Sequence, residues 1–420
     1  MNDRQAEGQA PHELIARSFC LPCGQTLKNR LMKSAMSEAL GTADNHVTPG
    51  LVTLYDRWAR GGAGLLVTGN IMVDRRALGE PNNVAVEDVR DMDLLRSWAR
   101  AGTQNGTQLW AQLNHPGKQV PRGLNAEAVA PSAIPFNQAL RRFFETPREL
   151  TENEIADIIE RFGRSAEIIQ KAGFTGVQIH AAHGYLVSQF LSPHHNQRND
   201  RWGGNPENRR RFLVEIFRRI RQGVGPAFPL AVKLNSADFQ RGGFSEEESL
   251  AVIHTLIEEG VDLVEISGGN YEAPAMSGRR AAESTRRREA YFLEFAAKVR
   301  SRLGIPLAVT GGFRTAPAMA AALADGHLDL IGLARPLAVD PDYCARVLAG
   351  QPPIVTIRPI STGIKAVDRM ALMEVAWYSR QLHRLAAGKA PRPDESGLSS
   401  FIKTILTSGY RTFRTRRLRA

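Results

Sequence analysis

Two histidines and a tyrosine lie within six positions of one another, directly behind a predicted strand. The apolar run Gly176–Ile179 has the composition of a buried strand, and His180, His183 and Tyr185 follow it. A single histidine is usually structural, but two imidazoles and a phenol behind one strand are harder to explain without chemistry. Barrels of alternating strands and helices build their active sites on the loops that follow the strands. We therefore predict an active site at these three residues.

Two glycine-rich turns further along the chain have the composition of a phosphate site. Residues 310–314 (TGGFR) follow one predicted strand, and residues 332–336 (GLARP) follow the next. Small residues let backbone N–H groups approach an anion, and an arginine adds a bidentate donor. One such turn is weak evidence. Two of them after the last strands of a barrel predict that the protein binds a phosphate group.

Other predicted strands also end in small or polar residues. Residues 34–37 (SAMS) follow the first strand, Gly69 follows the second, and Gln112 lies in the third. Lys233 stands inside the apolar fifth strand, which tolerates a lysine only if its ammonium has a partner. Near the mouth of a barrel, that ammonium would face an electron-rich heterocycle. Gln112 both donates and accepts hydrogen bonds, which suits the edge of such a ring.

Strands and helices alternate through most of the chain. The predicted strands are residues 31–36, 64–68, 107–113, 177–179, 230–234, 262–266, 306–310 and 328–333. The predicted helices are residues 49–60, 89–104, 151–171, 206–222, 245–259, 289–303, 315–324 and 341–348, of which the third and fifth begin with capping boxes. No GxGxxG turn follows the first strand, which favours a closed (β/α)8 TIM barrel of the α/β class over a doubly wound sheet. We predict this barrel over residues 1–350, with a long functional or mobile loop at residues 114–148.

Residues 351–420 do not continue the repeat and carry most of the net charge. They hold 13 Lys and Arg against 4 Asp and Glu, in a chain whose net charge is +11. A helical pattern at 370–385 precedes a proline-rich break and a basic end. One interpretation is a helix packed on the barrel with a solvated terminus. The other is a basic amphipathic segment that lies on a partner or an anionic membrane surface. We predict a C-terminal helical, basic extension and no nucleic-acid partner.

The composition is that of a globular protein. The chain has 420 residues, of which 43% are hydrophobic and 23% charged. We find no run of eighteen apolar residues and no apolar core of a secretory signal near the first residue, and three cysteines cannot form a disulfide framework. These features predict a cytoplasmic protein. Cys20 and Cys23 form a CxxC sequence that predicts a turn or short hairpin, without the context of a redox or metal site.

Several long stretches, in order, resemble the Old Yellow Enzyme family of FMN-dependent NAD(P)H oxidoreductases. They are LKNRLMKSAMS (27–37), GGAGLLVTG (61–69), AQLNHPGKQ (111–119), AGFTGVQIHAAHGYLVSQFLSP (172–193), NQRNDRWGGNPENRRRFLVEI (196–216), VTGGFR (309–314) and IGLARPL (331–337). The resemblance covers roughly residues 12–350. It implies a (β/α)8 barrel, in agreement with the pattern of strands and helices, with FMN as cofactor and NAD(P)H as reductant.

The resemblance also implies a role for each site residue. The flavin ring would be lined by Ala35, Ser37, Gly69, Gln112 and Lys233, and the FMN phosphate held by Gly312, Ala334 and Arg335. His180 and His183 would hydrogen-bond the activating oxygen of the substrate, and Tyr185 would donate a proton. Ser37 stands where relatives often have Thr or Cys, and Lys233 where they usually have Arg, so the flavin potential and affinity stay open.

The function implied is that of an ene-reductase for electron-poor alkenes such as enones. Hydride passes from reduced flavin to the β-carbon, two N–H donors stabilise the enolate oxygen, and the phenol protonates the α-carbon. Reduction of nitro or nitrate-ester groups, or oxidative amine demethylation, stays open as an alternative on the same barrel. Because Cys344 stands alone in its region, we expect no iron–sulfur centre of the kind found in the dienoyl-CoA and trimethylamine branches. The sequence leaves the physiological alkene and the oligomeric state open.

Overall fold

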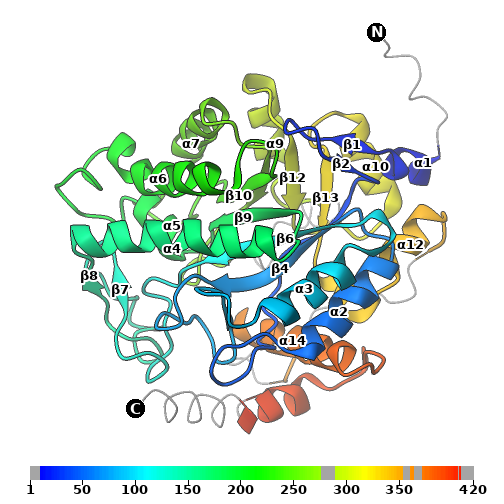
Figure 1. Cartoon of the computed structure of the whole chain (residues 1–420), viewed down its shortest axis with the longest axis horizontal. Coiled ribbons are helices and arrows are strands. Elements are labelled where there is room, and N and C mark those ends of the chain that lie inside the picture. The colour runs from blue at the N-terminus through cyan, green and yellow to red at the C-terminus, as the bar shows by residue number, and fades with distance from the viewer. Residues whose placement is uncertain (1–9, 276–288, 353–359, 364–370, 405, 408–420) are drawn as a thin grey trace.

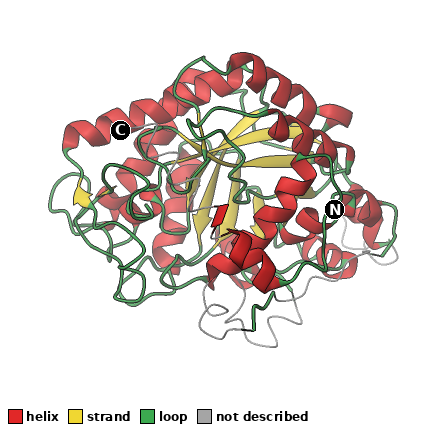
Figure 2. Ribbon diagram, turned by 90° about the horizontal axis from the view of Figure 1, so that it is seen from below, coloured by secondary structure: helices red, strands yellow, loops and turns green. Residues whose placement is uncertain are grey.

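Eight parallel strands form a closed barrel. The computed structural model describes residues 10–275, 289–352, 360–363, 371–404 and 406–407. The barrel strands are β3 (Leu31–Lys33), β4 (Leu65–Met72), β6 (Gln108–Asn114), β9 (Gly176–Ala181), β10 (Leu230–Asn235), β11 (Leu263–Ser267), β12 (Leu307–Thr310) and β13 (Leu330–Leu333). Because β3 pairs with both β13 and β4, the first strand joins the last. The strands lie inside a surrounding layer of helices (Figures 1 and 2). The predicted (β/α)8 fold is confirmed.

The predicted helices correspond closely to the observed ones. These are α2 (Pro49–Arg60), α3 (Met92–Gly102), α4 (Glu152–Lys171), α6 (Pro206–Val224), α7 (Glu246–Glu258), α9 (Leu293–Arg302), α10 (Ala316–Ala324) and α12 (Tyr343–Leu348). Both capping boxes form, with Thr151 and Ser245 accepting from the backbone N–H three residues on. Helix α9 starts later than predicted because Glu289 and Ala290 have φ of 58° and 47°, which an α-helix cannot contain.

The shortest elements carry no signal in the sequence. Three short helices escaped prediction because five or six residues are too few to show a helical period: α1 (Pro11–Ala16), α5 (Leu186–Leu191) and α11 (Arg335–Val339). The two-residue strands β5 (Val84–Ala85), β7 (Val129–Ala130) and β8 (Arg148–Glu149) were also missed. The first barrel strand ends at Lys33, whereas β4 continues to Met72, four residues past its predicted end.

A hairpin closes the end of the barrel opposite the predicted active site. Strands β1 (Phe19–Cys20) and β2 (Thr26–Leu27) pair antiparallel around the CxxC sequence, so the predicted hairpin is confirmed. Leu21 and Leu27 pack against the first residues of several barrel strands. Both cysteines of the turn are free, and burial raises the pKa of Cys23 to about 11. A thiol held protonated in this way is a poor nucleophile or metal ligand.

The described part of the C-terminal extension packs on the barrel. Helix α14 (Ala371–Ala386) lies against α2 and α11, and its Trp377 and Leu382 are buried in the main core (Figure 1). His383 Nε2 lies 2.7 Å from the Glu38 carbonyl oxygen, and the Ser379 hydroxyl donates to the Ser37 carbonyl over 2.7 Å. The helix therefore fixes the loop that follows β3. Among the described residues, no helix is long and apolar enough to cross a membrane.

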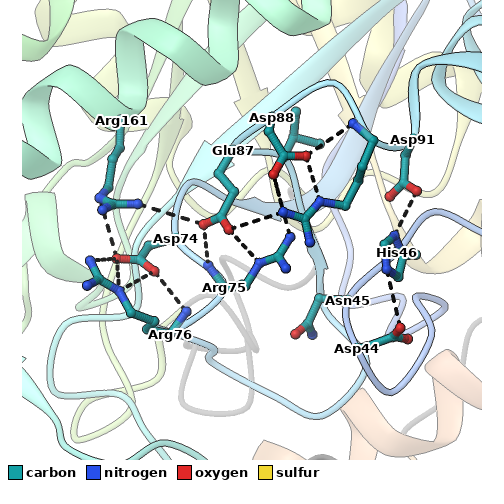
Figure 3. A network of polar contacts seen from close by, with 12 residues as sticks. Asp44, Asn45, His46, Asp74, Arg75, Arg76, Glu87, Asp88, Asp91 and Arg161 are labelled. Atoms are coloured by element: carbon teal, nitrogen blue, oxygen red, sulfur yellow. Dashed lines mark hydrogen bonds and ion pairs between the residues drawn. The ribbon is translucent and has the colours of Figure 1, made fainter. Parts of the chain in front are cut away.

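An ion-pair network fixes the segment between β4 and α3 (Figure 3). Arg161 of α4 lies 3.5 Å from an oxygen of Asp74 and 3.7 Å from an oxygen of Glu87. His46 Nδ1 lies 2.8 Å from Asp91. The same segment carries Glu80, which accepts from the Ser37 hydroxyl and whose charge acts on Tyr185. The network therefore positions one wall of the mouth from outside.

Candidate active site

One strand end and one tight turn bring the three predicted catalytic rings together. His180 lies inside β9 rather than on the loop after it, because the strand continues to Ala181. His183 has φ of 61°, an uncommon conformation for a residue with a side chain, and Gly184 has φ of 78°. The His183 N–H donates to Asn235 Oδ1 over 3.1 Å, which supports the strained turn. The His180 ring centroid then lies 5.1 Å from that of His183 and 4.8 Å from that of Tyr185.

Both histidines are neutral hydrogen-bond donors at physiological pH. Burial, with the nearby positive charge of Lys233, holds the pKa of His180 and of His183 well below its usual range. The Ala182 N–H donates to His180 Nδ1 over 3.2 Å, so the proton of that neutral ring is on Nε2. His183 Nε2 lies 2.7 Å from the Ser267 hydroxyl, which donates or accepts as the tautomer requires. The pair can therefore offer N–H groups to a substrate oxygen.

The Tyr185 hydroxyl has two partners that the sequence did not indicate. Asn70 Nδ2 donates to it over 3.4 Å, and the Tyr271 hydroxyl lies 3.2 Å away. A register irregularity between β4 and β6 directly precedes Asn70, and such irregularities often re-aim a side chain. Burial, followed by the charge of Glu80, raises the pKa of Tyr185 to about 12. The phenol is therefore fully protonated at neutral pH and available as a proton donor.

A chain of buried polar groups crosses the mouth of the barrel from strand to strand. Lys233 Nζ lies 2.9 Å from Glu265 Oε1, so the partner that an ammonium inside an apolar strand needs is a carboxylate of the next strand, β11. Gln178 donates to Glu265 over 2.8 Å and in turn accepts from Gln112 over 2.7 Å. Thr310 donates to Glu265 over 2.6 Å. Gln112 and Lys233 are thus joined in one network.

The two glycine turns are brought together by the pairing of β12 with β13, in which Thr310 lies opposite Gly332. Gly311 and Gly312 have φ of 130° and 101°, and a side chain on Gly312 would lie 2.8 Å from the Ala290 nitrogen. Ala334 precedes α11, and Arg335 begins it with its guanidinium partly exposed.

The loop after β12 already binds an anionic group of the protein itself. The backbone N–H groups of Arg314 and Thr315 both donate to one carboxylate oxygen of Glu289, over 2.5 and 3.1 Å. Backbone donors, two glycines and a guanidinium at adjacent strand ends have the chemistry that a phosphate group requires. The residues present therefore fit the phosphate of FMN.

The remaining predicted flavin-lining residues lie at the ends of β3 and β4. The Ser37 hydroxyl donates to Glu80 over 2.5 Å, so it already has a partner in the protein. The Gly69 N–H donates to the Tyr55 hydroxyl over 3.2 Å, and a side chain on Gly69 would lie 2.6 Å from the Met36 oxygen. Ala35 is partly buried against the barrel interior. The flavin-lining role of these three residues stays a prediction.

Several site residues escaped sequence reasoning. The sequence does contain a signal for Glu265, because this carboxylate stands inside the apolar stretch LVEIS. A charged residue inside an apolar strand is the same signal that pointed to Lys233. Asn70 and Tyr271 have no such signal in the sequence. Each belongs to the site only because it contacts the Tyr185 hydroxyl, which follows a different strand.

A closed (β/α)8 barrel with glycine turns after its last two strands, and neutral donors beside a phenol at its mouth, has the architecture of an enzyme with a phosphate-bearing cofactor. Residues 23–353 match the model of the NADH:flavin oxidoreductase / NADH oxidase family. The chain therefore belongs to this family, which includes the Old Yellow Enzymes, and it is an FMN-dependent oxidoreductase that uses NAD(P)H as reductant.

Relatives and a solved structure agree with this assignment. The NADH-dependent flavin oxidoreductase iccE of Talaromyces variabilis is 37% identical over 409 residues, covering 89% of this chain and 98% of that protein. The NADH-dependent flavin oxidoreductase iliE of Hypocrea jecorina (strain QM6a) is 38% identical over 345 residues, covering 76% and 85%. The Old Yellow Enzyme homologue from Zymomonas mobilis shares the fold, with a TM-score of 0.69, 24% identity and coverage of 82% and 94%.

The buried neutral histidines make stability depend on pH. Burial also holds the pKa of His195 well below its usual range. As pH falls below about 6.5, the unfolded chain binds protons on these imidazoles and the folded chain does not. The free energy of unfolding should then fall by about 1.4 kcal/mol per pH unit for each such histidine. Urea unfolding between pH 7 and pH 5 measures this slope.

A matched pair of variants assigns the slope. His195→Asn should lower the slope by the contribution of one histidine. His254→Asn should leave the slope unchanged, because His254 is exposed on α7. Equal slopes in wild type and His195→Asn would show that His195 binds a proton in the folded protein.

Proposed function

We propose that the protein reduces carbon–carbon double bonds conjugated to an electron-withdrawing group, such as those of enones, with NAD(P)H as the reductant. The observation that carries the proposal is the group formed by His180, His183 and Tyr185. Two neutral imidazoles and a protonated phenol lie in ring contact at the barrel mouth. The imidazoles supply two hydrogen-bond donors for one substrate oxygen, and the phenol supplies a proton for a neighbouring carbon of the substrate.

Each residue has a distinct task in this reaction. FMN, when bound, supplies a hydride to the β-carbon of the alkene. His180 and His183 donate hydrogen bonds to the carbonyl oxygen, where negative charge develops as that carbon is reduced. Tyr185 gives its proton to the α-carbon, so the alkene gains one hydride and one proton in all. Neutral imidazoles suit this task, because they bind the oxygen without first surrendering a proton to it.

The cofactor-binding residues follow the same proposal. Lys233 and Gln112, tied together through Glu265 and Gln178, would face one edge of the flavin ring, with Ala35, Ser37 and Gly69 completing its surroundings. The phosphate would be held by Gly312, Ala334 and Arg335. The polar network supports the first group, and the paired glycine turns with the partly exposed Arg335 guanidinium support the second.

A nitro or nitrate-ester substrate is the second candidate. Its oxygens would accept from the same two imidazoles, and reduction there requires no proton on carbon. The two candidates therefore differ in their need for the Tyr185 hydroxyl.

The phosphate assignment predicts the effect of one substitution. Arg335→Ala should weaken FMN binding by roughly 10- to 150-fold, because a hydrogen bond to a charged group is worth about 1.5–3 kcal/mol. Fluorescence titration of the apoprotein with FMN measures the change. Arg302→Ala, which removes an exposed guanidinium at the end of α9, is the control and should bind FMN as wild type does. Equal affinity in Arg335→Ala would assign the phosphate to other donors.

The reaction assignment predicts a separation of two half-reactions. Tyr185→Phe keeps the ring and removes the hydroxyl, so flavin reduction by NAD(P)H in stopped flow should stay within a few-fold of wild type. Reoxidation by cyclohexenone should slow by roughly 10²–10⁴, the usual worth of a positioned general acid. Reoxidation by a quinone or a nitroarene should stay fast. Unchanged reoxidation by the enone would mean that water or another residue supplies the proton.

We also propose that the C-terminal extension contacts an anionic membrane surface. Leu398, Ile402 and Leu406 are four residues apart on the last described helical turns, and all three side chains are exposed. Residues 398–420 contain six Lys and Arg and no Asp or Glu. An apolar stripe in a sequence whose charged residues are all basic is typical of a segment that binds a lipid surface with negative headgroups.

Sedimentation with vesicles tests the membrane contact. Wild type should sediment with phosphatidylserine-containing vesicles, less so in high salt, and not with pure phosphatidylcholine vesicles. Ile402→Asp should lose the binding while enzymatic activity is retained. Absence of binding to the anionic vesicles at low salt would exclude this surface. Dimerisation of wild type that Ile402→Asp abolishes would instead assign the stripe to a second copy of the chain.

A further inference from the structure

A second phenol lies against the proton donor of the active site. Tyr271, on the loop after β11, places its hydroxyl 3.2 Å from that of Tyr185. Asn70 Nδ2 lies 3.4 Å from the same Tyr185 oxygen. One phenolic oxygen therefore has two potential donors from two different strand ends. In the proposed function the two histidines bind the substrate oxygen, so Tyr271 and Asn70 are not needed for that contact.

The loop that carries Tyr271 is held from both sides. The Asn270 side-chain oxygen accepts from the backbone N–H groups of Glu272 and Ala273, each over 2.9 Å. Glu272 in turn accepts from the Asn137 N–H over 2.8 Å and lies 3.7 Å from the ammonium of Lys118. The loop is thus held by contacts on either side of Tyr271.

We propose that Tyr271 is a positioning residue for the proton transfer: its hydroxyl donates to the Tyr185 oxygen and stabilises the phenolate left when Tyr185 gives up its proton. The inference rests on the proposed function, since it requires Tyr185 to act as the acid. The Tyr185 O–H bond breaks, a C–H bond forms at the α-carbon of the substrate, and the charge stays on the Tyr185 oxygen. A proton from water then restores the phenol after the product leaves.

The surroundings make this assistance necessary. Burial and the nearby carboxylate of Glu80 both oppose a negative charge on Tyr185 and raise its pKa, whereas the hydrogen bonds from Tyr271 and Asn70 lower it. The pKa of Tyr271 itself is raised well above its usual range by burial and by Tyr185. Tyr271 therefore keeps its own proton while Tyr185 loses one, as a donor to the phenolate must.

A purely steric role is the competing explanation. The Tyr271 ring lies 6.0 Å from that of Phe144, which lies 4.6 Å from Phe136, so the three rings form an aromatic wall. Tyr271→Phe separates the two explanations, because it keeps the ring in the wall and removes only the hydroxyl. Thr103→Val is the control: it removes a hydroxyl that donates to the Ala99 carbonyl over 2.8 Å at the end of α3, away from the proton donor and from the proposed cofactor site.

The first experiment compares half-reactions of the FMN-loaded protein. In Tyr271→Phe, reoxidation by cyclohexenone should slow by roughly 10- to 100-fold, the effect of losing a hydrogen bond to a charged group. Reduction by NAD(P)H and reoxidation by a quinone should match wild type, as should all three rates in Thr103→Val. In a Tyr185→Phe background, adding Tyr271→Phe should change nothing further, because the group it acts through is gone.

The second experiment needs no turnover. With 3,5-difluorotyrosine at position 185, whose fluorines make the phenol more acidic, ¹⁹F NMR follows its titration. Tyr271→Phe should raise its pKa by roughly one to two units, since the phenolate loses one donor. Thr103→Val should leave the pKa at position 185 unchanged.

The outcomes distinguish this inference from the function on which it rests. If wild type reduces enones and Tyr271→Phe does so equally fast, or if the pKa at position 185 does not rise, Tyr271 is only part of the wall. Slowing of the quinone reaction by the same factor would also overturn the proposal, because it indicates general disturbance of the site. If wild type reduces no enone while the pKa still rises, the proposed function fails, and the hydrogen bond to Tyr185 stands.

Discussion

The ion pair between Lys233 and Glu265 determines the electrostatics of the barrel mouth. Both side chains are buried, and a buried charge is tolerated only when it is paired and further hydrogen-bonded. Glu265 meets this condition by accepting from Gln178 and Thr310 as well. A buried ion pair contributes little net stability, but leaving either charge alone costs a great deal. Its effect is therefore to fix the side chains of β9, β10, β11 and β12 in one arrangement.

The positive charge of Lys233 also acts on His180 and His183. Lys233 lies opposite His180 in the register between β9 and β10, and its positive charge opposes protonation of both imidazoles. Burial alone would keep them neutral, and the ammonium adds to the effect. A neutral imidazole has one N–H and one lone pair, and for His180 the lone pair on Nδ1 is already occupied by the Ala182 N–H. The donor direction of His180 thus follows from local backbone geometry.

The sequence predicted what depends on local pattern. Alternating strands and helices gave the barrel, and the capping boxes at Thr151 and Ser245 gave two helix starts. The imidazoles and the phenol were identified because they lie within six positions of each other. Asn70 and Tyr271 could not be identified, because their contacts with Tyr185 join residues 115 and 86 positions apart. The late start of α9 depends on positive φ at Glu289, a residue type that gives no warning of it.

The same distinction applies to the C-terminal extension. Its helical period predicted α14, but no pattern predicted that His383 and Ser379 would contact the backbone at Glu38 and Ser37. The Glu38 carboxylate in turn accepts from Lys33 and Tyr55, and the Tyr55 hydroxyl accepts from the Gly69 N–H. A continuous chain of hydrogen bonds therefore joins α14 to the ends of β3 and β4, where the flavin-lining residues are proposed to lie. A buried chain of polar groups is stable only when each member has its hydrogen-bond partners. A substitution in α14 should therefore alter the hydrogen bonding of the Gly69 N–H.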